Sequence, residues 1–74
     1  MAKQGGSGVY RVTEVIGSST SSWEDAARQA VETASSTLRD LRIAEVTKLD
    51  VRLDDSGKIA QFRTRLSLSF KYEG

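Results

Sequence analysis

The chain has 74 residues, with 11 lysines and arginines against 10 acidic residues, and it contains neither histidine nor cysteine. One small domain fits this length, and the missing residue types exclude disulfides, thiolate or imidazole zinc sites, and Ser-His-Asp or Cys-His catalysis. A net charge of +1 gives no long-range field for nucleic acid. No apolar run approaches the roughly 18 residues of a membrane span. We therefore expect a cytoplasmic, non-enzymatic protein without a nucleic-acid or membrane partner.

The N-terminal residues contain Gly-Gly-Ser-Gly and lack the apolar centre of a signal peptide. We predict a flexible tail over residues 1–8 and a single domain over residues 9–74. A domain of this size is marginally stable alone. With disulfides and zinc excluded, association of several copies is the remaining way to stabilise it.

The first predicted strand covers Val9 to Ile16, which is rich in β-branched and aromatic residues, and it should break at Gly17. Hydroxyl residues follow, and Ser21 with Glu24 three residues later fits a capping box. In that motif the serine oxygen accepts a first-turn N–H and the carboxylate reaches back to the N–H of the cap. A helix should therefore begin directly after Ser21.

The helix is predicted from about Ser22 to Arg39. Apolar residues at three- and four-residue steps form one stripe: Trp23, Ala27, Ala30, Ala34, Leu38 and Leu41. Because half of the stripe is alanine, the helix can lie close against a sheet. Trp23 begins the stripe, so we expect it in the core and not in a ligand site.

Two further strands are predicted over Leu41 to Leu53 and Lys58 to Tyr72. The segment Asp54-Asp55-Ser56-Gly57 between them is typical of a turn, so the two strands should form an antiparallel hairpin. The second of them alternates regularly, and its apolar face is predicted to comprise Ala60, Phe62, Thr64, Leu66, Leu68, Phe70 and Tyr72.

The strand from Leu41 to Leu53 is less regular. Strict alternation puts Ile43, Leu49, Val51 and Leu53 on one face and Ala44 and Val46 on the other. A strand whose apolar face changes along its length is expected to meet different neighbours, such as another subunit. The predicted fold is α+β, a β-α-β-β protomer whose three-stranded antiparallel sheet wraps around one helix. One helix cannot cover strands this long, so the remaining apolar surface should lie between subunits.

With this order of elements the chain resembles a dodecin over roughly Val9 to Tyr72. The segments that carry the resemblance are Val9-Tyr10-Arg11-Val12, Glu14-Val15-Ile16-Gly17-Ser18-Ser19, Trp23-Glu24-Asp25-Ala26-Ala27, Ala44-Glu45-Val46 and Ser69-Phe70-Lys71. The resemblance implies a hollow homododecamer built from trimers. It also implies storage or buffering of a small molecule or ion in the cytoplasm.

Most dodecins sequester flavin, and this chain departs from them at both flavin contacts. Flavin-binding members carry a stacking tryptophan where this chain has Ile43, which has no π face. They carry a glutamine for the pyrimidine edge where this chain has Arg63, which offers only donors. The resemblance therefore implies a degenerate flavin pocket that comprises Ile43, Glu45 and Arg63. The helix start and the Asp54 to Ile59 hairpin resemble a smaller branch of the family that is described as calcium-binding.

Calcium takes about 6–8 oxygen ligands, and the candidate ligands in this chain are Glu45, Asp50 and Asp54. Each has a plainer interpretation. Asp54 belongs to a turn sequence, whereas Glu45 and Asp50 are placed to pair with a basic side chain of the same sheet. A carboxylate near a threefold axis would be tripled by symmetry, which favours Glu45 and Asp50.

A phosphate is a further candidate ligand, because the guanidinium groups of Arg63 and Arg65 lie on one strand face and match its oxygens. Their plainer interpretation is pairing with Glu45 or Asp50. Three functions stay open at this point. We favour a calcium-binding shell over a flavin-storage dodecin with an altered site, and over a structural shell without a dedicated ligand.

Overall fold

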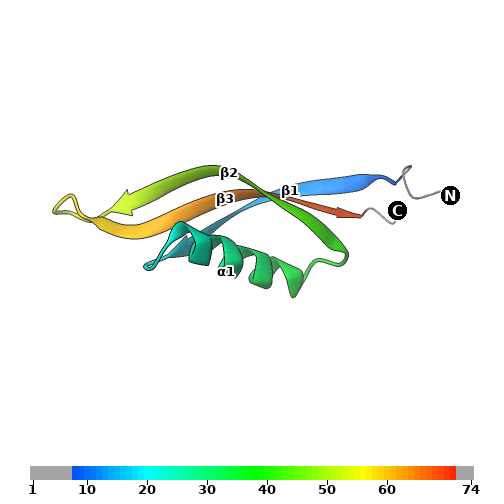
Figure 1. The fold of residues 1–74 in the computed structure, drawn as a ribbon, viewed down its shortest axis with the longest axis horizontal. Coiled ribbons are helices and arrows are strands. Elements are labelled where there is room, and N and C mark those ends of the chain that lie inside the picture. Colours follow the sequence, from blue (N-terminus) through cyan, green and yellow to red (C-terminus); the bar gives the residue numbers. More distant parts are fainter. Residues whose placement is uncertain (1–7, 72–74) are drawn as a thin grey trace.

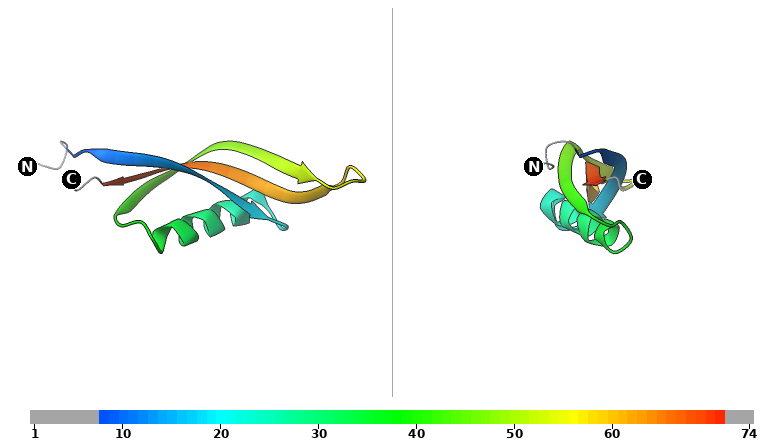
Figure 2. Two further views of the ribbon diagram at one scale, coloured as in Figure 1. Left: turned by 180° about the vertical axis from the view of Figure 1, so that it is seen from behind. Right: turned by 90° about the vertical axis from the view of Figure 1, so that its right-hand side faces the viewer.

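The computed structural model describes residues 8–71, so all of the predicted tail except Gly8, and also Tyr72, lie outside the described residues. Its elements in chain order are β1 (Tyr10–Ser19), α1 (Trp23–Ser35), β2 (Leu41–Leu53) and β3 (Ile59–Lys71). The strands pair antiparallel in the order β1-β3-β2, so the last strand is central. The sheet curves over the helix (Figures 1 and 2). The predicted β-α-β-β fold is confirmed.

The protomer is elongated, extending 57 Å along its longest axis and 20 Å and 18 Å across it. Helix α1 and strand β3 each have 13 residues. Thirteen residues span about 20 Å as a helix but about 43 Å as a strand, so the helix covers only part of the sheet. The β2–β3 hairpin consequently projects beyond the start of the helix (Figure 1). Within residues 8–71 the helix is also too short and too polar to cross a membrane.

The core forms between α1 and β3. Its buried apolar side chains are Ala26, Ala30, Ala34, Leu66 and Leu68. Thr64 is buried with them, which confirms the inward face predicted for the last strand. The helix stripe needs correction, because Ala26 is fully buried whereas Ala27 is only partly buried and Leu41 belongs to β2.

The sequence predicted that the first strand breaks at Gly17, but this prediction is wrong. Strand β1 continues through it to Ser19, and Gly17 pairs with Thr64 of β3. A Cβ atom at Gly17 would clash with the carbonyl oxygen of Ala26 and would lie 2.9 Å from the Cβ of Ala30. Glycine is therefore present because the helix backbone lies directly against the strand, and not because the chain turns there.

The helix is capped by Ser22 and not by the predicted Ser21–Glu24 box. Ser22 has extended backbone angles, and its hydroxyl oxygen accepts the N–H of Asp25 at 3.0 Å. The Asp25 carboxylate does not reach back to the cap. It accepts the hydroxyl of Ser19 at 2.6 Å, together with donors from Arg28 and Gln29. These contacts hold the pKa of Asp25 below its ordinary value, with the Ser19 hydrogen bond as the main cause.

Replacing the Ser22 cap by alanine should lower the free energy of unfolding by about 1 kcal/mol, because one first-turn N–H loses its acceptor. Ser21→Ala is the matched control, since Ser21 is exposed and is not the cap. Urea unfolding at a fixed protomer concentration measures both changes. An equal or larger loss for Ser21→Ala would contradict this assignment of the cap.

The helix ends at Ser35, four residues before the predicted end at Arg39. Two hydroxyls turn back onto helix carbonyls there, Ser36 Oγ to the oxygen of Thr33 at 2.7 Å and Thr37 Oγ1 to that of Ala34 at 3.3 Å. Such side-chain contacts compete with helix continuation. Further on, Asp40 has a left-handed φ of 57°, which directs the chain into β2.

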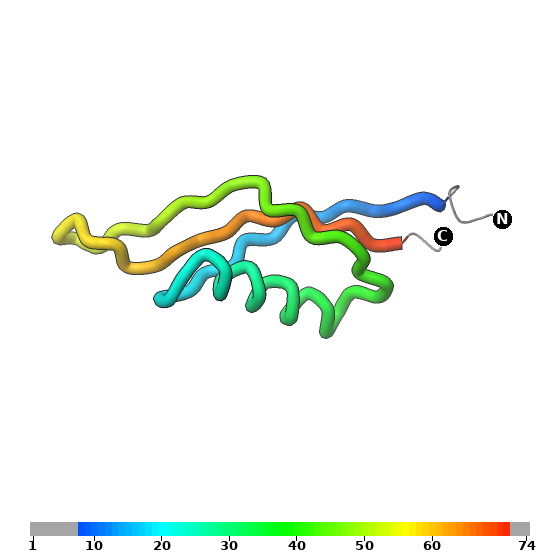
Figure 3. The backbone as a smooth tube through the Cα atoms, in the orientation of Figure 1, coloured from blue at the N-terminus to red at the C-terminus, as the bar shows by residue number. Residues whose placement is uncertain are grey.

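Strand β2 contains bulges that the sequence analysis did not anticipate. Its register shifts between Leu41 and Ile43, between Val46 and Lys48, and between Arg52 and Leu53. The second shift changes the alternation, so that Val46 opposite Leu66 and Leu49 opposite Thr64 share the helix side. The stepped path of β2 is visible in Figure 3. The apparent change of apolar face thus includes a bulge, and contact of β2 with another subunit stays a prediction.

Candidate functional site

Asp50 and Arg63 face each other across β2 and β3, on the side of the sheet away from the helix (the outer face). Arg63 Nε donates to Asp50 Oδ1 at 2.7 Å and Arg63 Nη2 donates to Asp50 Oδ2 at 3.0 Å. The pair of hydrogen bonds lowers the pKa of Asp50 and raises the pKa of Arg63 from their ordinary values. Their pairing with each other within one sheet, which was the plainer interpretation of both residues, is thus confirmed.

The backbone of Asp50 has a separate partner on the helix side of the sheet. Its carbonyl oxygen accepts the indole N–H of Trp23 at 2.9 Å. The Trp23 ring packs edge-on against Phe62, with centroids 5.1 Å apart, and the Trp23 carbonyl accepts the Thr64 hydroxyl at 2.9 Å. Trp23 is partly buried and connects the helix start to β2 and β3. Its indole is therefore a structural anchor, but Trp23 lies at the edge of the core and is not one of the buried residues that the sequence led us to expect.

The degenerate flavin positions do not come together in one protomer. Ile43 lies opposite Ser69, and Arg63 lies opposite Asp50. Six residues of β3 separate these two points, which corresponds to about 20 Å along the strand. Ile43 is 57% exposed. A pocket that used both Ile43 and Arg63 would have to draw them from different copies of the chain.

Glu45 lies on the outer face beside a second carboxylate. The register places Glu14 of β1 and Glu45 of β2 on either side of Ser67. Neighbouring strands lie about 4.8 Å apart, so the Cα atoms of the two glutamates are about 10 Å apart. Within residues 8–71 neither carboxylate makes a hydrogen bond or an ion pair. Glu45 is thus a predicted metal ligand whose oxygens remain uncommitted.

Asp54 stabilises the hairpin turn. Its Oδ1 atom accepts the N–H of Ser56 at 2.9 Å, the hydroxyl of Ser56 at 2.8 Å and the N–H of Lys58 at 3.0 Å. The hydrogen bond from the Lys58 backbone is the main reason why the pKa of Asp54 is lowered. Gly57, with φ of 84°, completes the predicted turn.

The three predicted metal ligands therefore occupy separate places along β2 and its turn. Glu45 is opposite Ser67, Asp50 is paired with Arg63, and Asp54 lies at the hairpin tip. In the part of the chain that the structure describes, no three acidic side chains are grouped to hold a metal ion. A calcium site with enough oxygens would need ligands from more than one copy.

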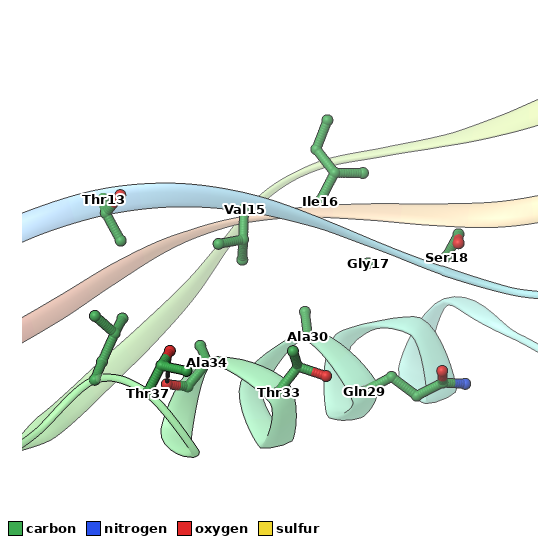
Figure 4. Close-up of a pocket in the computed structure, with 11 residues that line it drawn as sticks. Thr13, Val15, Ile16, Gly17, Ser18, Gln29, Ala30, Thr33, Ala34 and Thr37 are labelled. Carbon is green, nitrogen blue, oxygen red and sulfur yellow. Dashed lines mark hydrogen bonds between the residues drawn. The ribbon is translucent and has the colours of Figure 1, made fainter.

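A groove of about 580 Å³ lies between β1 and α1. The two elements touch at Gly17 and diverge toward the start of β1 (Figure 1). In Figure 4, Val15 points toward the helix, whereas Ile16 points away from it. Hydroxyl groups of Thr13, Thr33 and Thr37 edge the groove, and among residues 8–71 no charged side chain lines it. Its chemistry does not suit a calcium ion.

Comparison with known proteins identifies the family. The dodecin family model matches residues 9–73. The chain belongs to the dodecin family. The resemblance predicted from the sequence is thus confirmed.

Among its relatives, this dodecin is 44% identical to the calcium dodecin of Mycobacterium tuberculosis over 63 residues, which cover 85% of this chain and 87% of that protein. A solved structure of that calcium dodecin, described as having a novel calcium-binding site, matches with a TM-score of 0.78 and 43% identity over 88% of this chain and 91% of the other. The dodecin of Streptomyces coelicolor matches with a TM-score of 0.84 and 41% identity, over 92% of this chain and 96% of the other.

Two features of the outer face escaped the sequence analysis because they depend on register. The glutamates at positions 14 and 45 are 31 residues apart in the chain and become neighbours only through Ser67. Lys48 and Arg65 are directly opposite each other because of the shift between Val46 and Lys48. In the sequence such a bulge appears only as a change of apolar face, and the pattern alone does not distinguish a bulge from a change of neighbours.

Proposed function

We propose that this dodecin binds calcium without catalysing a reaction, as a storage or buffering protein in the cytoplasm, and that it does not bind flavin. The observation that carries this proposal is its 44% identity to a relative named a calcium dodecin. The chemistry of the outer face supports it, since Glu14 and Glu45 are oxygen donors without partners within residues 8–71. Hard cations such as Ca²⁺ prefer such oxygens.

The calcium ligands that we propose begin with Glu45, assisted by Glu14. Asp50 is a weaker candidate, because both of its oxygens accept hydrogen bonds from Arg63. Asp54 retains only Oδ2 for a metal, because Oδ1 accepts three donors in the turn. One protomer supplies too few free oxygens for a cation that takes about 6–8, so several copies would have to share each ion.

Assembly into a homododecamer of trimers is part of the proposal. Nine large apolar side chains in the described residues are at least 48% exposed: Val9, Tyr10, Val12, Ile16, Ile43, Val46, Leu49, Leu53 and Ile59. That much exposed apolar surface on so small a core is typical of a chain that associates. Symmetry would also multiply Glu45 and so supply the oxygens that one copy lacks.

Evidence against flavin comes from both contact positions. Ile43 offers no ring for stacking, and the Arg63 guanidinium is already held by Asp50. Titration with riboflavin or flavin mononucleotide should leave flavin fluorescence unquenched. Strong quenching at micromolar protein would overturn the proposal in favour of flavin storage.

Calorimetric titration of the chelator-stripped full chain with calcium tests the proposal directly. We expect saturable heat for the wild type and at least about a tenfold weaker affinity for Glu45→Gln, because a charged ligand is lost. Glu32→Gln, on the exposed side of α1, removes the same charge elsewhere and should bind like the wild type. Absence of heat would overturn calcium binding. Saturable heat that Glu45→Gln leaves unchanged would instead overturn only the assignment of the ligand.

A further inference from the structure

Four charged side chains form a cluster on the outer face, which we call the basic cluster: Lys48 and Asp50 from β2, and Arg63 and Arg65 from β3. Lys48 is opposite Arg65, and Asp50 is opposite Arg63. The intervening pair, Leu49 and Thr64, lies on the helix side, so all four members share one face. The cluster holds three positive charges and one negative charge.

Two of the three positive charges have no ion-pair partner of their own within residues 8–71. Like charges directly opposite each other in a sheet are unfavourable, yet Lys48 and Arg65 occupy such a pair. Within residues 8–71 neither makes an ion pair. The nearest carboxylates further along this face, Glu14 and Glu45, lie opposite Ser67, two positions beyond Arg65. An added anion would relieve the repulsion between Lys48 and Arg65.

The third positive charge already holds an oxyanion. Arg63 presents Nε and Nη2 to the two oxygens of Asp50, which is the geometry in which a guanidinium also receives a phosphate. Arg63, Arg65 and Lys48 all lower the pKa of Asp50, so their fields converge on its carboxylate. Both side chains of the pair are more than a third exposed, at 37% and 41%, so water can solvate them when they separate.

We propose that the basic cluster is a binding site for the phosphoryl group of a small phosphate compound, and that the Asp50 carboxylate occupies it when no ligand is bound. An incoming phosphate takes the Arg63 donors from Asp50 and is neutralised by Lys48 and Arg65. A multiply charged phosphate competes well with a single carboxylate, because it interacts with all three cations at once. Of the calcium ligands proposed above, only the weaker candidate Asp50 belongs to this site, whereas Glu45 and Glu14 lie opposite Ser67.

Titration of the full chain with inorganic pyrophosphate, in the presence of a chelator, tests the site without any contribution from calcium. The wild type should bind weakly, and Asp50→Asn should bind at least about tenfold tighter because the competing carboxylate is gone. Asp50→Asn with Arg63→Gln should lose this gain. Asp55→Asn, an exposed acid of the hairpin turn, makes the same charge change away from Arg63 and is the matched control.

The fold of each variant can be checked by the fluorescence of Trp23, the one tryptophan of the chain. Its indole hydrogen bond goes to the backbone of Asp50 and not to the side chain, so Asp50→Asn should leave its emission unchanged. Equal affinity of folded Asp50→Asn and wild type would overturn the proposal. So would an equal gain for Asp55→Asn, since the effect would then come from net charge alone.

Discussion

Gly17→Ala should lower the free energy of unfolding by about 3 kcal/mol, at the upper end of the usual range for an overpacked core. The new methyl group would clash with the carbonyl oxygen of Ala26 and lie 2.9 Å from the Cβ of Ala30. Backbone atoms cannot rotate away from it, so α1 would have to move off the sheet. A domain of this length has a total stability of roughly 4–11 kcal/mol, which makes this a large fraction.

Gly57→Ala provides the control for this change. Gly57 has φ of 84°, and apart from its two chain neighbours no residue in the described part of the chain has an atom within 4 Å of an added Cβ. Its replacement should cost roughly 1–2 kcal/mol, from the left-handed conformation alone. Urea unfolding at equal protomer concentration compares the two variants, because assembly links stability to concentration. A smaller loss at Gly17 than at Gly57 would contradict the close backbone contact.

Leu68→Ala should have a comparable effect by the opposite mechanism. Leu68 is fully buried, with Thr13 of β1 and Ala44 of β2 as its neighbours in the sheet. It packs in one cluster with Ala30 and Ala34, whose short side chains cannot extend into a cavity. Deleting its Cγ atom and two methyl groups should therefore lower the unfolding free energy by about 3 kcal/mol, within the range for buried leucines.

Leu53→Ala removes the same atoms from a side chain that is 54% exposed. It should lower the unfolding free energy of the protomer much less, because those atoms are already largely in contact with water. Thermal or urea unfolding over a series of protomer concentrations separates loss of the core from loss of contacts between copies. A greater loss at Leu53 than at Leu68 at every concentration would contradict this location of the core.

Much of this fold could be predicted from local sequence signals. Strand β2 was predicted with its observed ends, and β3 within one residue at each end, because the Asp54 to Gly57 turn defines the hairpin between them. The inward face of β3 followed from simple alternation, since that strand carries no extra residue at Thr64, Leu66 or Leu68. In such segments, neighbouring residues determine the structure.

Contacts between distant segments were the part that could not be predicted. Gly17 looked like a strand end, and only its contact with Ala26 and Ala30 explains it. The choice between the two serines as the cap depended on where β1 ended, which in turn depended on Gly17. The site shows the same limit. The Asp50–Arg63 pair was one of several pairings open from the sequence, and the register of β2 against β3 selects it.

The shift between Val46 and Lys48 divides β2 into two segments, and each segment pairs with β3 in its own register. Residues on both sides of it pair with β3, and Asp50, after the shift, also accepts the indole N–H of Trp23 at the helix start. A second irregularity, between Arg52 and Leu53, lies close to that turn. An insertion or deletion of one residue in the hairpin can therefore be absorbed before it reaches Leu66 and Leu68. A hairpin of a different length can thus leave the interior unchanged while it alters which side chains lie on the outer face.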